Sequence, residues 1–492
     1  MMHCVSMKRL LVSAASAVTS VALAACAVGP NFVRPAAPQG TDLTAQPLPG
    51  STVVADGKAQ RFAAGQRVAA DWWRLLSCPQ LDAIVVESLA KNPGLEAARA
   101  TLRMSQDTLR AGYGVFVPQG SLGAGVTRES YNPAPGIIQA PSTPFTLFTV
   151  SANVSYAIDI WGGQRRQIEA LRAQVDDERY ALAGTYIMLS GNVVNTVIAQ
   201  AGYRAEIDAT IASIAVQREQ LRITQAQAEA GTVPYSNVLS IRSQIAITEA
   251  TLPPLEQKID QAADLLATLA GQTPAEWKQP RIALTDLTLP RDLPVSLPSE
   301  LVRQRPDVLQ AEAVVHAANA NIGMATAAML PNLTLSAGYG VGATSSGSGP
   351  LWNLGAGLTQ PVFQEGTLAY QRKAAMDAHD VSLAGYRQTV LLAFDQVADT
   401  LRGLQHDAEA VRAQTEAVDT AAAAMQLIQA NYAAGISNYL QVVIADGQYL
   451  IARIGYVQAV TQRLQDTVAL YVALGGGWWN APVEQPSATH KP

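Results

Sequence analysis

The chain has 492 residues, and its 34 Lys and Arg against 39 Asp and Glu give a formal net charge of −5. This balance excludes the strong basic excess that nucleic-acid-binding proteins carry. Charged residues make up 15 % and hydrophobic residues 49 %, whereas an ordinary soluble domain is roughly 25 % charged. We therefore expect lipid or other subunits to cover much of the surface. After residue 26 no apolar run of about 18 residues occurs, so no transmembrane helix is predicted.

Groups that could carry catalysis or bind a metal are few. The five histidines and three cysteines show no spacing typical of a metal site. No P-loop, dinucleotide-binding fingerprint or nucleophile elbow occurs. Cys78 is the one cysteine in the body of the chain, and we expect it to be a buried thiol. The sequence thus predicts neither an enzyme nor a cofactor.

The N-terminus has the pattern of a secretory signal. Lys8 and Arg9 precede an uncharged run of Leu, Val, Ala and Ser that ends in Leu23-Ala24-Ala25-Cys26. This ending is similar to the bacterial lipobox, in which the cysteine becomes the lipidated first residue of the mature protein. We therefore expect a lipoprotein signal peptide at 1–25 and lipidation of Cys26. The alternative is a plain secretory signal with a chance cysteine.

The residue after the cysteine is Ala27 rather than Asp, so retention in the inner membrane is not indicated. A lipoprotein carries three acyl chains, and two or more chains anchor a protein firmly. Several prolines follow, so we expect residues 26–70 to form an extended, lipid-anchored tether. Translation could start at Met1 or at Met7.

The body of the chain contains one pattern twice. Asn92-Pro93-Gly94-Leu95 reappears as Arg305-Pro306-Asp307-Val308, and later motifs reappear in the same order, among them the glycines at 231 and 435. The spacing between corresponding motifs changes only once along the chain, and one local insertion explains that change. The sequence predicts a first repeat at 71–271, an equatorial connector at 272–304, a second repeat at 305–475 and a C-terminal tail at 476–492.

Each repeat contains two segments in which apolar and small polar residues alternate. In the first segment Leu122, Ala124 and Val126 alternate with Ser, Gly and Thr. Alternation over about ten residues is typical of barrel strands with one face toward lipid. A soluble hairpin with one wet face is the alternative, but the polar faces are nearly uncharged. Strands are predicted at about 119–128, 148–160, 332–341 and 351–362, joined within each repeat by turn-rich loops at 131–144 and 342–350.

Outside the strands the pattern is helical. Residues 163–229 and 366–432 contain no proline, and a helix of that length would span roughly 100 Å. Apolar residues of the second segment, from Val390 to Met425, alternate spacings of four and three, which predicts a coiled-coil seam. Shorter helices are predicted at about 93–117, 236–270, 306–330 and 438–474, with helical hairpins turning at about 231–235 and 435–438.

Four strands form an open sheet, and open edges are not tolerated in hydrocarbon. The chain must therefore share a barrel with other copies. Two copies would supply eight strands, a barrel that side chains fill, whereas three would supply twelve and leave a lumen. The small residues on the polar face favour a lumen and hence a trimer.

The ordered motifs of this chain resemble one family, the TolC-like outer-membrane efflux factors, and in particular their NodT-type lipoprotein branch. They are, in chain order, the lipobox with Val28-Gly29-Pro30-Asn31-Phe32, Asp71-Trp72-Trp73, Asn92-Pro93, Asp159-Ile160-Trp161-Gly162, Arg305-Pro306-Asp307-Val308, Gln360-Pro361-Val362-Phe363 and the run from Tyr432 to Leu440. The match extends from residue 23 to about 479.

The resemblance implies a mixed α and β membrane protein of the Gram-negative outer membrane. It implies a homotrimer in which four strands per chain make a shared 12-stranded barrel, continued by an α-helical coiled-coil tunnel through the periplasm. It also implies an equatorial collar from about 45–91, 271–305 and the C-terminal tail. A periplasmic adaptor protein and an inner-membrane pump, commonly of the resistance-nodulation-division type, would be its partners.

For the tunnel tip, the resemblance implies adaptor docking at the two helix–helix turns, with Gly231, Thr232, Pro234, Gly435, Ser437 and Asn438 as candidates. In the family, aspartates six and nine residues after the second glycine often ring the closed aperture. Gln441 and Ile444 occupy these positions here, and the nearest acid is Asp446. Tyr432 matches the family's gate tyrosine. We therefore expect a hydrophobic and hydrogen-bonded gate.

The function expected from this resemblance is passive export of drugs or other small toxic compounds, with energy supplied by the partner pump. Two alternatives remain at this point. The same fold could conduct proteins, as in type I secretion, or the chain could be a non-conducting trimeric coiled-coil lipoprotein scaffold. The cargo and the cognate pump are not encoded in this sequence.

Overall fold

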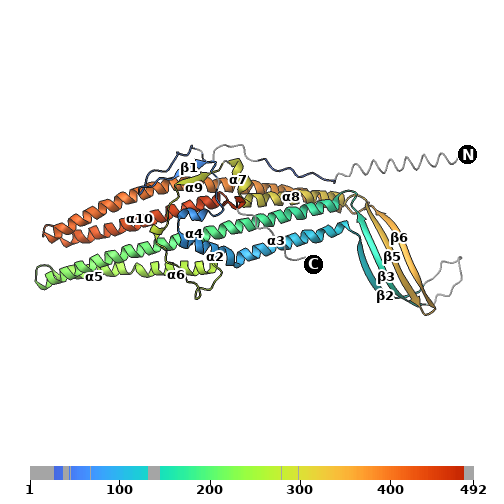
Figure 1. Cartoon of the computed structure of the whole chain (residues 1–492), viewed down its shortest axis with the longest axis horizontal. Helices are drawn as coiled ribbons and strands as arrows, with labels where there is room; N and C mark the ends of the chain where they lie inside the picture. The colour runs from blue at the N-terminus through green and yellow to red at the C-terminus, as the bar shows by residue number, and fades with distance from the viewer. Residues whose placement is uncertain are drawn as a thin grey trace. The chain divides into compact units, whose positions relative to one another are not determined.

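The computed structural model describes residues 27–36, 44, 46–66, 68–130, 144–278, 280–296 and 298–480 (Figure 1). The predicted signal peptide and Cys26 lie outside these residues. The chain forms two compact units: a strand unit from residues up to 35, 101–179 and 310–387, and a helical unit from 36–100, 180–309 and 388–492. Each sequence repeat therefore contributes to both units, which are described separately below.

The strand unit contains a four-stranded antiparallel sheet in the order β2-β3-β5-β6. Its strands are β2 (Gln119–Glu129), β3 (Phe145–Ile158), β5 (Asn332–Thr344) and β6 (Gly347–Thr359). The two inner strands, β3 and β5, come from different repeats and pair along eleven positions from Phe148↔Ala343 to Ile158↔Leu333. The sheet thus joins the two copies of the duplicated unit.

Three of the strands have limits that differ from the predicted ones. The strand expected at 148–160 spans 145–158, because the carboxylate of Asp159 already caps the next helix by accepting hydrogen bonds from the amides of Gln164 and Arg165. The strands expected at 332–341 and 351–362 extend toward each other to Thr344 and Gly347, and the second ends at Thr359. The Gly- and Ser-rich loop expected at 342–350 is instead mostly paired strand, since β5 and β6 pair from Asn332↔Thr359 up to Thr344↔Gly347.

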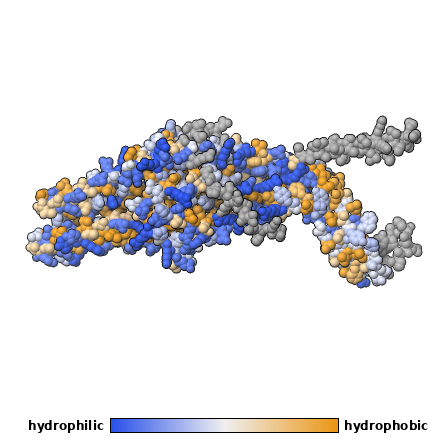
Figure 2. All heavy atoms as spheres, viewed as in Figure 1, coloured by the Kyte–Doolittle hydropathy of each residue, from blue (hydrophilic) through white to orange (hydrophobic). Residues whose placement is uncertain are grey.

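The register places unlike residues on the two faces of this sheet. One cross-strand row contains Leu122, Ala152, Tyr339 and Trp352. A row of the other face contains Ser121, Asn153, Gly338 and Asn353. Leu122 is 88 % exposed and Trp352 is 76 % exposed, so the described chain leaves the apolar face uncovered. In Figure 2 orange and pale residues cover most of the sheet.

Two helices are far longer than the rest: α4 (Gly163–Glu229) and α9 (Thr367–Ala433), each of 67 residues. One window of α4 is apolar enough by composition to cross a membrane, but half of that window is buried inside the chain. Val193, Val194 and Val197 of α4 lie in the main hydrophobic core. We therefore interpret α4 as a core helix. The α9 seam is confirmed from Val390 to Val411, where almost every seam residue is buried.

The shorter helices are α2 (Pro79–Lys91), α3 (Pro93–Gly112), α5 (Tyr235–Glu249), α6 (Leu252–Leu269), α7 (Pro298–Gln304), α8 (Pro306–Ala327) and α10 (Tyr439–Ala473). The single helix predicted at 236–270 is wrong, since the chain forms α5 and α6 with a break at 250–251. Pro253 and Pro254 cause the break, because proline has no amide hydrogen and its ring clashes with the carbonyl four residues earlier.

The core of the helical unit contains the two tryptophans of the Asp71-Trp72-Trp73 motif. Trp72 and Trp73 are 1 % and 3 % exposed, and Trp72 stacks on Tyr471 with ring centroids 5.4 Å apart. The buried Cys78 lies in the same core. Two short strands that the sequence analysis missed, β1 (Arg61–Ala64) and β4 (Asp292–Val295), pair in parallel beside it. Each has only four residues, too few for a periodic signal.

Candidate functional site

The α4–α5 hairpin of the helical unit turns at residues 230–234. Gly231 has a positive φ of 74°, and its amide donates to the carbonyl of Ala228. The amide and the hydroxyl of Thr232 both donate to the carbonyl of Gln227 at 2.9 Å. This pattern is a Schellman cap, in which a left-handed glycine lets the chain reverse. Pro234 then precedes the first residue of α5.

The α9–α10 hairpin turns in the same way 204 positions later. Gly435 has a φ of 73°, and the amide of Ile436 donates to the carbonyl of Asn431 at 2.8 Å. The Ser437 hydroxyl donates to the Ile428 carbonyl at 3.2 Å. The Asn438 side chain caps α10 by accepting a hydrogen bond from an amide of its first turn. The six docking candidates therefore form two equivalent turns.

The two hairpins pack on each other behind these turns. Ile241 and Ile245 of α5 form a small core with Tyr439 of α10. The Tyr432 hydroxyl on α9 donates to Oε1 of Gln227 on α4 at 2.8 Å. This hydrogen bond crosses from one hairpin to the other within one chain.

The gate candidates on α10 lie on two different faces of that helix. Gln441 is exposed, and Ile444 is 50 % exposed, so both are free to contact another chain or a lumen. Asp446 is only 4 % exposed, and its Oδ2 accepts hydrogen bonds from Ser213 at 3.0 Å and Gln217 at 2.7 Å. In this conformation Asp446 faces α4 and not a lumen. The assignment of the gate to these residues stays a prediction.

Burial raises the pKa of Asp446, and the hydrogen bonds from Gln217 and Ser213 oppose that rise. The sequence analysis missed both partners. Ser213 and Gln217 are spaced four apart, which places them on one helical face, and this spacing was the available signal. It could not show that α10 would cover that face.

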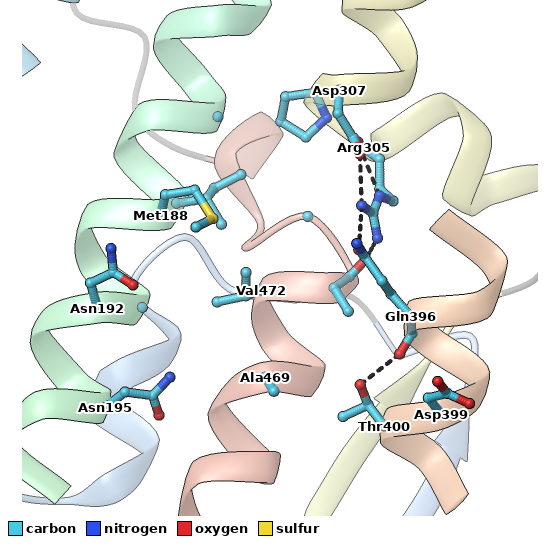
Figure 3. A pocket seen from close by; sticks show the side chains of 16 residues that line it. Met188, Asn192, Asn195, Arg305, Asp307, Gln396, Asp399, Thr400, Ala469 and Val472 are labelled. Carbon is cyan, nitrogen blue, oxygen red and sulfur yellow. Dashed lines mark hydrogen bonds and ion pairs between the residues drawn. The ribbon is translucent and has the colours of Figure 1, made fainter. Parts of the chain in front are cut away.

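The Arg305-Pro306-Asp307 motif lies at the end of a cavity of about 600 Å³ between α4, α9 and α10 (Figure 3). Arg305 is 7 % exposed and donates to the Ala473 carbonyl, to Gln396 and, with two nitrogens, to Asp307. It therefore connects the start of α8 with α9 and the end of α10. Figure 3 shows Met188, Asn192 and Asn195 on α4 across the cavity from Asp399 and Thr400 on α9.

Residues 28–34 of the expected extended tether form a segment that we call the strap. The strap is extended but bound to the strand unit. Arg166, whose side chain is 4 % exposed, donates to the carbonyls of Val28 and Gly29 and to Oδ1 of Asn31. Gly29 has a φ of 91° and packs directly on the backbone of Gly323, so a side chain there would clash.

Ring and ion contacts extend this attachment. Phe32 stacks on His316 with ring centroids 4.2 Å apart. Nε of Arg34 lies 2.7 Å from the carboxylate of Glu312. The strap begins two residues after Cys26.

Among the described residues, no group of three or more His, Cys, Asp or Glu side chains is placed to hold a metal ion. The assembled features are helix turns, a sheet with one apolar face and a bound strap. Such features can form a surface that binds another molecule or the wall of a passage.

Comparison with known proteins gives a consistent result. The family model described as "Outer membrane efflux protein" matches residues 84–272 and 297–476, which correspond to the two repeats. The pyoverdine export outer membrane protein OpmQ of Pseudomonas putida is 29 % identical over 414 residues, covering 83 % of this chain and 88 % of that protein. Nodulation protein T of Rhizobium leguminosarum bv. viciae is 26 % identical, covering 96 % and 95 %. The solved outer-membrane channel OprN superposes with a TM-score of 0.83 at 25 % identity, covering 92 % and 100 %.

Proposed function

Because the chain belongs to the outer membrane efflux protein family, we propose that three copies of it form the outer-membrane duct of a tripartite efflux system. The protein is a transport component of the Gram-negative outer membrane. In the proposed system it conducts drugs or other small toxic compounds passively. A periplasmic adaptor and an inner-membrane pump, of the resistance-nodulation-division type, deliver the cargo and the energy.

The sheet is the observation that carries this proposal. β2 and β6 are its edge strands, and its apolar face is uncovered within the described chain. A membrane-spanning sheet must close so that every backbone group is paired. Three copies supply twelve strands, and the small side chains of the polar face leave space for a lumen.

The hairpin tips suit adaptor docking. Ile436 in the second turn is 76 % exposed, and Tyr235 beside the first is 59 % exposed. Large apolar side chains at an exposed, rigid turn are typical of a protein contact. Because the two turns are equivalent, a trimer presents six similar tips. An adaptor hexamer would match that number.

A second anchoring device supports the placement in the membrane. Lipidation of Cys26 would attach the chain covalently to lipid, and the strap would fix that point against the strand unit. The barrel would anchor the trimer independently. We therefore expect Cys26→Ser to block lipid attachment, as seen by mass spectrometry of the mature N-terminus, and to leave partial export.

The proposal is tested by cross-linking and conductance of the full protein. Cross-linking in detergent should stop at three copies, and the purified trimer should conduct ions in planar bilayers. A monodisperse monomer, or a trimer without conductance, would reject the duct. Deleting the gene should raise susceptibility to small toxic compounds, whereas a selective loss of protein secretion would favour a type I duct.

A further inference from the structure

A small cavity lies inside the helical unit, just behind the hairpin tips. It has a volume of about 20 Å³ and is lined by α4, α5 and α10, with valine and isoleucine side chains on its apolar side. We call it the tip cavity. One water molecule needs roughly 10–15 Å³ of such space, so the tip cavity has room for one.

Four polar atoms around the tip cavity lack a hydrogen-bond partner in the described chain. They are Oδ1 of Asp446, Oε1 of Gln217, Nε2 of Gln220 and the hydroxyl of Tyr439. The side chains of Asp446, Gln217 and Tyr439 are 4 %, 6 % and 9 % exposed, so bulk water does not reach them freely. Leaving a buried polar atom unpaired costs about 1–3 kcal/mol.

The donor and acceptor types of these atoms are complementary to water. Asp446 Oδ1 and Gln217 Oε1 are acceptors, Gln220 Nε2 is a donor, and the Tyr439 hydroxyl can act as either. A water molecule donates two hydrogen bonds and accepts up to two. A cation would be repelled by the amide hydrogens of Gln220, so the set favours water.

We infer that the tip cavity binds one water molecule, which bridges α4 to α10 and so joins the two helical hairpins of one chain. The other oxygen of Asp446 already makes direct bonds to Ser213 and Gln217 of α4. Gln217 also lies 3.4 Å from Thr248 of α5. The water therefore completes a polar network that connects three helices behind the tip.

Asp446 also lines a second, larger cavity of about 320 Å³. Asp208 of α4 and Arg453 of α10 line it too. Tyr439 and Tyr432 are the titratable groups on the tip side, and the α5 residues that line the tip cavity are uncharged.

The bound water accommodates both protonation states of Asp446. It donates to the ionised carboxylate and accepts from the protonated acid. Because burial raises the native pKa of Asp446, the hairpin packing gains stability at low pH and loses it as the pH rises through that pKa. In the proposed duct, a rise in pH through that pKa would then loosen the tip. Only this last consequence depends on the proposed function.

Hydrogen exchange of the full protein tests the site. The measurement is the protection of backbone amides at 213–224 and 439–450. With water bound, Tyr439→Phe removes a hydrogen bond, so protection should fall about fivefold, corresponding to about 1 kcal/mol. If the cavity is dry, Tyr439→Phe deletes an unpaired polar group and protection should rise. Tyr432→Phe, which breaks the direct bond to Gln227, sets the scale for one lost hydrogen bond.

The pH dependence of protection is tested with Asp446→Asn, because an asparagine side chain has nearly the same shape as aspartate and does not ionise. In the wild type, protection corrected for intrinsic exchange should fall as the pH rises from about 4, near the ordinary pKa of Asp, through the raised native pKa of Asp446. The variant should show no such change. Equal pH dependence in both proteins, or greater protection in Tyr439→Phe, overturns the inference. Conductance of the trimer, measured separately, reports on the duct and not on this site.

Discussion

Asp407 of α9 and Asp466 of α10 are two acidic side chains at the packed interface between these helices. Burial, then a hydrogen bond with Asp466 and the charge of Asp466, raise the pKa of Asp407 to about 8, against an opposing effect of Arg463. At neutral pH Asp407 therefore keeps its proton and donates it toward Asp466. A shared proton replaces the repulsion that two carboxylates would exert.

This pair predicts a specific pH dependence of stability. The native pKa of Asp407 is above its ordinary value, so its contribution is present at low pH and is lost as the pH rises through about 8. The free energy of unfolding, measured by thermal or denaturant unfolding, should therefore fall between about pH 4 and about pH 8 and level off above that. Asp407→Asn keeps the hydrogen-bond donor and should flatten the profile. Asp419→Asn, at an exposed position of α9, is the control and should leave the profile as it is.

At the scale of elements, the hairpin turns depend on two glycines. Gly231 and Gly435 hold left-handed backbone that a residue with a side chain adopts only at a cost. A Cβ at either position meets no atom within 4 Å, so the cost is conformational and not steric. The β5–β6 hairpin also places a glycine with positive φ at its turn, since Gly347, which follows Ser345 and Ser346, has a φ of 146°.

Glycine-to-alanine substitutions at two positions of one hairpin should change the free energy of unfolding in opposite directions. Gly435→Ala should destabilise the fold by about 1–2 kcal/mol, because the left-handed conformation strains alanine. Gly447→Ala, in the middle of α10 with open space at its Cβ, should stabilise it by up to about 1 kcal/mol. Gly231→Ala changes the corresponding glycine of the first repeat, so it should destabilise the fold by the same amount as Gly435→Ala. Equal effects at 435 and 447 in thermal unfolding would contradict this account of the turn.

At the scale of the whole molecule, the proposed gate is a property of the trimer. Gln441 and Ile444 are exposed in one chain, whereas Asp446 is buried against α4. A ring of three Ile444 side chains would bury apolar surface, worth about 25 cal/mol for each Å² removed from water. Three Gln441 side chains could bond to neighbouring helices without the mutual repulsion of three carboxylates.

Divalent cations should accordingly block the wild-type channel poorly, since carboxylate oxygens are the ligands these cations prefer. Gln441→Asp would place three carboxylates together and should create a cation block. The measurement is single-channel conductance in planar bilayers with added divalent or trivalent cations. Block of the wild type at micromolar cation, relieved by Asp446→Asn, would show that Asp446 forms the ring and that the apolar gate is wrong.

The sequence by itself determined the elements whose signal is local. The absence of proline and the alternating apolar spacing determined α4, α9 and the seam from Val390, because helix periodicity depends only on neighbouring residues. The glycines at 231 and 435 likewise marked the turns, since a left-handed cap is a local requirement. Where individual residues decided an element's limit, as Pro253 and Pro254 did after α5, the periodic signal alone was misleading.

Only the tertiary structure decided which faces meet. The pairing of β3 with β5 joins segments from different repeats, and alternation alone specifies no partner. The burial of Asp446 depends on α10 lying against Ser213 and Gln217, which are 233 and 229 positions away. The binding of the strap by Arg166 likewise joins residues 135 positions apart. Such contacts are set by the packing of whole helices and strands, and periodicity shows that a face is buried without showing what covers it.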